Sequence, residues 1–241
     1  MQPLIAVIGP TASGKTALGE FLALELNGEI ISADAKQVYR GMDIGTAKEA
    51  VLRVPQHLID IRNPGEAITV AEYQALAYSA IDDALARGKQ PILVGGSMLY
   101  AQAVLDGYEF TELGKSVSAT PRYRSLALGI AWDREALKAK ATARLHERIA
   151  AGLADEVRSL LNNGVSPEWL DACGIEYRFF SQYVRGEIPL EQATTQTMHA
   201  IHQYIKRQYT WWRGHGDVRW VANQKEALEV SKAFLLHPSM H

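Results

Sequence analysis

The chain has 241 residues, of which 47% are hydrophobic and 22% are charged, with a formal net charge of −2. This length suits one large domain or a domain with an appendage, and the composition allows a sizeable core. The charge excludes a uniformly basic nucleic-acid binder, although a local basic patch remains open. The single cysteine, Cys173, excludes a disulfide framework. No apolar run reaches the roughly 18 residues that span a bilayer, so we expect a cytoplasmic protein without a membrane partner.

The first predicted elements surround a phosphate-binding motif. Residues 4–8 form a short apolar run typical of a buried parallel strand, and residues 17–26 have helical spacing. Between them the chain reads G-x-x-x-x-G-K-[ST], a loop whose backbone N–H groups surround phosphates and whose usual ligand is ATP or another nucleotide. Its lysine supplies a point charge, and its last hydroxyl can ligate Mg2+. The residues are Gly9, Pro10, Thr11, Ala12, Ser13, Gly14, Lys15 and Thr16.

The rest of the first half alternates strands and helices, which indicates a parallel sheet with crossover helices. Strands are expected at 29–32, 57–61 and 91–96, helices at 70–86 and 97–105, and a polar loop at 36–48. Residues 1–110 are therefore interpreted as a P-loop NTPase-like α/β core. Residues 111–125 are polar and are expected to form a short loop.

The second half, residues 126–241, is expected to hold the last core strands and a helical part. The pattern predicts a strand at 126–132, a long helix at 133–161 kinked at Gly152, and helices at 169–181 and 190–209. A strand at 218–221 returns to the sheet, and a helix follows at 224–236. The fold class is thus α/β, with a parallel sheet flanked by helices and a C-terminal helical part.

Three predicted strand ends carry chemistry. They are the phosphate loop, Asp34, and the turn Gly95-Gly96-Ser97. Ligands of open parallel sheets lie beyond the carboxyl ends of the strands, so we expect one shared cleft. Asp34 is a candidate general base, with metal binding through water or helix capping as alternatives. Ser97 could cap a helix or orient either a substrate or Asp34.

A basic aromatic run lies near the C-terminus. Four Lys or Arg and one acid occur between residues 206 and 219, with Tyr204 just before them and Tyr209, Trp211 and Trp212 among them. Such a pattern is typical of surfaces that hold a phosphate backbone and stack on bases. The alternative is an amphipathic helix whose tryptophans are core and whose cations are solvated.

Taken together, these segments resemble the tRNA dimethylallyltransferases, also called tRNA isopentenyltransferases. The matching segments are the phosphate loop, Asp34 to Lys48, His57 to Asp60, Gly95 to Tyr100, Gly152 to Val157, and Lys206 to Trp211, in the family's order. The resemblance implies transfer of a dimethylallyl group from dimethylallyl diphosphate to N6 of the adenine 3′ to the anticodon of tRNA. Diphosphate is the leaving group.

The resemblance also implies roles for individual residues. Asp34 would accept the N6 proton, Ser97 would contact the base or Asp34, and Lys15 would assist catalysis. Residues 9–16 would hold the diphosphate, and the Thr16 hydroxyl would be a ligand of Mg2+. We expect a monomer. The implied tRNA-binding residues are Asp34, Ala35, Lys36, Gln37, Ser97, Lys206, Arg207, Gln208, Trp211 and Arg213.

The chain departs from the family pattern at three places. Ala35 replaces a common serine, and His202 falls near a position where the family often has arginine. The family's helical insertion, which clamps the anticodon stem, is reduced to the polar residues 111–125. Two enzymatic alternatives therefore stay open, an adenylate isopentenyltransferase acting on free adenine nucleotides and a P-loop small-molecule kinase. An RNA-binding protein with a vestigial phosphate loop is the non-enzymatic alternative.

Overall fold

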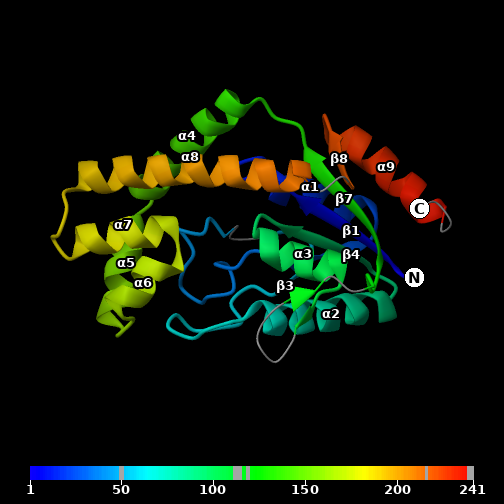
Figure 1. Ribbon diagram of the computed structural model, residues 1–241, viewed down its shortest axis with the longest axis horizontal. Coiled ribbons are helices and arrows are strands. Elements are labelled where there is room, and N and C mark those ends of the chain that lie inside the picture. Colours follow the sequence, from blue (N-terminus) through cyan, green and yellow to red (C-terminus); the bar gives the residue numbers. More distant parts are fainter. Residues whose placement is uncertain (49–51, 111–115, 118–119, 215–216, 238–241) are drawn as a thin grey trace.

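A six-stranded sheet lies at the centre of the protein (Figure 1). The computed structural model describes residues 1–48, 52–110, 116–117, 120–214 and 217–237. The strand order is β3-β2-β4-β1-β7-β8, and every neighbouring pair is parallel. The strands are β1 (Pro3–Ile8), β2 (Gly28–Ser32), β3 (Gln56–His57), β4 (Gln90–Gly95), β7 (Arg124–Ile130) and β8 (Val218–Val221).

Both faces of the sheet are buried, as the continuous apolar strands predict. Side chains alternate along β1, so that Ile5 and Val7 pack on one face while Leu4, Ala6 and Ile8 pack on the other. Helices α1 (Lys15–Glu25) and α9 (Gln224–Leu236) cover the first face. Helices α2 (Val70–Ala86) and α3 (Met98–Asp106) cover the second.

Five helices form the C-terminal helical part beside the carboxyl edge of the sheet (Figure 1). They are α4 (Arg134–Ala150), α5 (Leu153–Asn162), α6 (Pro167–Cys173), α7 (Ile175–Val184) and α8 (Leu190–Gly214). This part has its own apolar core, which includes Leu145, Val157, Phe180 and Ile201. Helix α8, orange in Figure 1, runs from this part to the sheet, where the buried Trp212 joins the sheet core.

The structure corrects three predicted helices, and it reduces the strand expected at 57–61 to β3 (Gln56–His57). The expected helix at 133–161 is two helices, because Gly152 adopts φ 100° and caps α5. The expected helix at 169–181 is also two, separated by the extended Gly174. Helix α8 continues to Gly214, five residues beyond the predicted end, because its last turns pack Trp212 against the sheet.

The expected loop at 111–125 is only partly a loop. Residues 116–117 form β6 (Ser116–Val117), which pairs antiparallel with β5 (Glu109–Phe110), and β7 already begins at Arg124. Residues 111–115 and 118–119 lie outside the described residues. The predicted fold class is confirmed, and so is the return of the last strand to the sheet. Among the described residues, no helix combines the length and the apolar character needed to cross a membrane.

Candidate active site

The phosphate loop leaves β1 and enters α1 in a backbone conformation that glycine permits. Gly9 has φ 136°, and Gly14, which precedes the first turn of α1, has φ 87°. Of the eight loop residues, Thr11, Ala12, Lys15 and Thr16 line a pocket of about 680 Å³. The other four, Gly9, Pro10, Ser13 and Gly14, are not part of its lining. The helix N-terminus therefore faces the pocket, as an anion site requires.

Lys15 lies within the loop, where its ammonium Nζ donates to the carbonyl of Pro10 at 2.7 Å. The pKa of Lys15 is lowered to about 8, chiefly by burial; the nearby Asp34 opposes this shift, and Arg144 adds a smaller lowering effect. A bound anion stabilises the charged form of this buried amine, because the anion compensates the cost of burying the positive charge.

Asp34 lies just past β2, and Ser97 just past β4, the neighbouring strand. The carboxylate Oδ1 of Asp34 accepts from the backbone N–H of Lys36 at 2.9 Å, which fixes its orientation. The Ser97 hydroxyl accepts from the backbone N–H of Ala35 at 2.9 Å. Ser97 therefore holds the backbone beside Asp34, and its side chain makes no helix-capping bond. Its contact with the base or with Asp34 stays a prediction.

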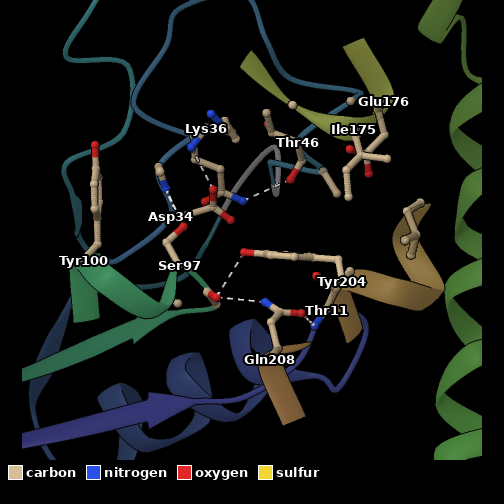
Figure 2. Close-up of a pocket in the computed structure, with 18 of the residues that line it drawn as sticks. Thr11, Asp34, Lys36, Thr46, Ser97, Tyr100, Ile175, Glu176, Tyr204 and Gln208 are labelled. Carbon is tan, nitrogen blue, oxygen red and sulfur yellow. Dashed lines mark hydrogen bonds between the residues drawn. The ribbon is translucent and has the colours of Figure 1, made fainter. Parts of the chain in front are cut away.

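The turn after β4 needs its two glycines. A Cβ atom on Gly95 would lie 2.0 Å from the Ala33 carbonyl oxygen, and one on Gly96 would lie 2.8 Å from the Gln208 amide nitrogen. These close approaches bring β2, β4 and α8 together at one point. The predicted convergence of the three strand ends on one cleft is confirmed, because all three contribute to the same pocket (Figure 2).

Gln208 on α8 links the phosphate loop to the turn after β4. Its Oε1 accepts from the backbone N–H of Thr11 at 2.9 Å, and its Nε2 donates to the Gly96 carbonyl at 2.8 Å (Figure 2). The side chain is 1% exposed. Gln208 was predicted to bind tRNA, and the structure gives both ends of its amide a partner within the protein.

Two walls enclose the pocket. The sheet wall consists of the strand-end residues Thr11, Lys15, Thr16, Asp34 and Ser97. The helical wall consists of residues on α4, α7 and α8, namely Arg144, Arg148, Glu176, Tyr204 and Arg207. Figure 2 shows Glu176 and Tyr204 on the side of the pocket across from Asp34 and Ser97.

The charged residues that line the pocket are mostly cations. Six are Lys or Arg and two are acids, namely Lys15, Lys36, Arg144, Arg148, Arg178 and Arg207 against Asp34 and Glu176. The pocket therefore attracts anions although the whole chain carries −2. An apolar section completes the lining with Val70, Met98, Leu99 and Tyr100. Burial raises the pKa of Tyr100 to about 12, so its hydroxyl stays neutral.

The remaining predicted tRNA-binding residues fall into two groups. Ala35, Lys36 and Gln37 line the pocket beside Asp34. Lys206, Arg207 and Arg213 are exposed on α8, and of these Arg207 also lines the pocket. The Arg213 guanidinium lies 4.4 Å from the centre of the Tyr209 ring.

The two tryptophans of the basic aromatic run pack inward. Trp211 is half-buried against the sheet core and Trp212 is 2% exposed. The cations of this run are therefore exposed to solvent, as a nucleic-acid surface requires, while its tryptophans pack inward, as the amphipathic-helix interpretation predicts. His202 is outside the pocket lining, and its Nε2 lies 3.1 Å from the Thr142 hydroxyl in a hydrogen bond.

Sequence reasoning missed the cations that α4 brings to the pocket. Arg144 and Arg148 are four residues apart and thus share one helix face, a spacing that is visible in the sequence. Nothing in the sequence shows that this face turns toward the phosphate loop. The packing of α4 against α8 places it there.

Three comparisons with known proteins agree with this arrangement. A sequence model of the IPP transferase family matches residues 37–120 and 109–215. A tRNA dimethylallyltransferase 2 from Shewanella sediminis is 40% identical over 87% of this chain and 88% of its own length. A tRNA dimethylallyltransferase 1 from Geotalea uraniireducens is 34% identical over 96% of each chain.

A solved structure matches the fold over nearly the whole length. The crystal structure of the full-length tRNA isopentenylpyrophosphate transferase from Bacillus halodurans superposes with a TM-score of 0.87 at 29% identity, covering 98% of this chain and 96% of that one. The family model thus covers residues 37–215, and the relatives and the fold match most of the chain. The chain belongs to the IPP transferase family.

Proposed function

We propose that this chain is a tRNA dimethylallyltransferase, which transfers a dimethylallyl group from dimethylallyl diphosphate to N6 of the adenine 3′ to the anticodon and releases diphosphate. The observation that carries the proposal is the pocket in which the Asp34 carboxylate and the phosphate loop line one space. Relatives that bear this name match the chain over most of its length.

The donor fits the sheet wall and the apolar section. Its diphosphate would lie against the N-terminus of α1 and Lys15, where backbone N–H groups and the ammonium favour negative charge. Its hydrocarbon tail would lie against Val70, Met98, Leu99 and Tyr100. As the bond from the allylic carbon to oxygen breaks, the bonding electrons pass to the diphosphate, and the cations of the pocket stabilise that charge.

The acceptor fits the other side of the pocket. The adenine N6 attacks the allylic carbon, a C–N bond forms, and Asp34 accepts the N6 proton. The hydrogen bond from the Lys36 N–H to Oδ1 holds the carboxylate while its second oxygen stays available. The target adenine leaves its stack in the anticodon loop to enter the pocket, at a cost of a few kcal/mol. One chain supplies every group used here, so a monomer suffices.

Mg2+ is proposed as the cofactor. No group of three or more His, Cys, Asp or Glu that could hold a metal occurs in the described part of the chain. Mg2+ needs no such group, because it takes one or two protein ligands and completes its shell with phosphate oxygens and water. The Thr16 hydroxyl lines the pocket at the N-terminus of α1 and suits this role. When bound, the ion would neutralise charge on the diphosphate.

A transfer assay tests the proposal against its alternatives. The chain is incubated with labelled dimethylallyl diphosphate and Mg2+, and separately with tRNA, AMP and ATP. We expect label in tRNA alone. Transfer to AMP or ATP but not to tRNA would instead identify an adenylate isopentenyltransferase. Phosphoryl transfer from ATP to a small molecule, with no prenyl transfer, would identify a kinase.

A further inference from the structure

A carboxylate from the helical part holds the loop that follows Asp34. Glu156 on α5 accepts from three consecutive backbone N–H groups. Its Oε2 accepts from Asp43 at 2.8 Å and Ile44 at 2.6 Å, and its Oε1 accepts from Gly45 at 3.0 Å. Three converging N–H groups form an anion nest, which here is filled by a side chain of the same protein.

Gly45, the third residue of this nest, is fixed on its other sides as well. Its carbonyl accepts from Arg148 Nη1 at 3.1 Å. A Cβ atom at Gly45 would lie 2.5 Å from the Tyr177 ring, so the backbone packs directly on that ring. Helices α4, α5 and α7 thus each contact the same residue.

Tyr177 completes the arrangement from α7. Its hydroxyl donates to Glu156 Oε1 at 2.8 Å. Burial, and then the neighbouring Glu156 carboxylate, raise the pKa of Tyr177 well above its ordinary value, so the hydroxyl keeps its proton. The Glu156 carboxylate therefore accepts four hydrogen bonds, three from the loop and one from Tyr177.

The loop connects this carboxylate to the pocket. Glu156 itself is outside the lining, but Gly45 and Thr46 are part of it. The Thr46 carbonyl accepts from Gln37 Nε2 at 3.2 Å (Figure 2), and Gln37 lines the pocket three residues after Asp34. Loss of the Glu156 contacts would release the segment against which the Gln37 amide is held.

We propose that Glu156 is a positioning residue, which docks residues 43–46 on the helical part and thereby holds Gln37 and Thr46 in place for the adenine of the acceptor tRNA. This inference rests on the proposed function and deepens it. Among the described residues, Gln208 and Trp132 hydrogen-bond to the phosphate loop, and the described hydrogen bonds of these two side chains do not involve residues 43–46. The Glu156 contacts therefore serve the acceptor side of the pocket and not the donor side.

The variant Glu156→Gln tests this with little change in size. In glutamine, an amide NH2 group replaces one of the two carboxylate oxygens. This group is a donor, so it cannot accept from the N–H groups that the oxygen binds in the wild type. The less costly orientation turns Nε2 toward Tyr177, whose hydroxyl can accept, and leaves the Gly45 N–H unpaired. Asp155→Asn is the matched control, because Asp155 is the adjacent carboxylate, is exposed, and pairs with Arg158 on the surface.

Two readouts separate positioning from simple stability. For Glu156→Gln we expect the KM for tRNA to rise about 10-fold, the effect of losing one hydrogen bond to a charged group, with the KM for dimethylallyl diphosphate unchanged. Hydrogen exchange at the amides of residues 43–45 should become faster, most of all at Gly45. Tyr177→Phe removes one donor and keeps the ring, so it should show the same pattern more weakly. Asp155→Asn should resemble the wild type.

Several outcomes would overturn the inference. Unchanged exchange at residues 43–45 in Glu156→Gln would refute the docking itself. Faster exchange with an unchanged KM for tRNA, or an equal rise in both KM values, would refute the role toward the acceptor. A wild-type chain that transfers no label to tRNA would instead refute the proposed function, and the exchange rates would still decide whether Glu156 holds the loop.

Discussion

The two walls of the pocket are built in different ways. The residues of the sheet wall lie at strand ends or in the phosphate loop, and the Asp34 carboxylate is held by a local bond from the backbone N–H of Lys36. The residues of the helical wall come from three helices, and one of these, α8, is joined to the sheet by long-range bonds such as that from the Thr11 N–H to Gln208 Oε1. We infer that the sheet wall holds the reacting groups, while the helical wall holds the acceptor and aligns it.

The largest expected effect concerns Asp34, which belongs to the sheet wall. Asp34→Asn removes the proton acceptor and keeps the shape, so kcat should fall about 10²- to 10⁴-fold. Binding of tRNA should stay near the wild-type value, because the amide oxygen can still accept from Lys36. Single-turnover transfer and a filter-binding titration measure the two quantities. A large loss of binding with normal turnover of bound tRNA would show that Asp34 is an acceptor contact and not the base.

Lys15 should control the affinity for diphosphate. Lys15→Met removes the ammonium and should weaken pyrophosphate binding about 10- to 100-fold. In the wild type the pKa of Lys15 is about 8, and a bound anion raises it. Binding should therefore be strongest below pH 8 and weaken as the pH rises above that value.

Calorimetric titrations of pyrophosphate between pH 6 and pH 10 measure this dependence in both proteins. Because the variant lacks the amine, its affinity should change much less above about pH 8. The same decline in Lys15→Met would mean that another group causes it, and the assignment to Lys15 would be wrong.

Gln208 connects the two walls, so its loss should affect both substrates. Gln208→Leu leaves the Thr11 N–H without its partner and removes a donor to Gly96. We expect kcat/KM to fall about 10-fold for each substrate, the effect of burying an unpaired polar group. Steady-state kinetics against donor and acceptor measure this. Gln192→Leu, at an exposed position in the first turn of α8, is the control, and a loss confined to one substrate would contradict the link.

The exposed cations of α8 should have the smallest effects, and these should be confined to tRNA. Lys206→Ala and Arg213→Ala should each weaken tRNA binding about 2- to 5-fold and reduce its salt dependence. Titrations at several salt concentrations measure this, with Lys225→Ala on α9 as the control. An unchanged salt slope in both α8 variants would place the tRNA backbone elsewhere on the molecule.

The same contrast explains what the sequence could reveal. The phosphate loop, Asp34 and Ser97 were predictable, because each follows a buried strand and parallel strands end at one edge. The role of Gln208 was not, since its partners Thr11 and Gly96 lie 197 and 112 residues away along the chain. The breaks at Gly152 and Gly174 were also missed as helix ends, because apolar residues continue across both in a helical spacing.

The most direct test of the account is to map the product. A tRNA treated with labelled dimethylallyl diphosphate is digested to nucleosides, which are separated and identified by mass spectrometry. We predict one labelled nucleoside, an adenosine prenylated on N6, from the position 3′ to the anticodon. The wild type and Asp155→Asn should produce it, and Asp34→Asn should not. Label on another atom or at another position, or equal product from Asp34→Asn, would contradict the account.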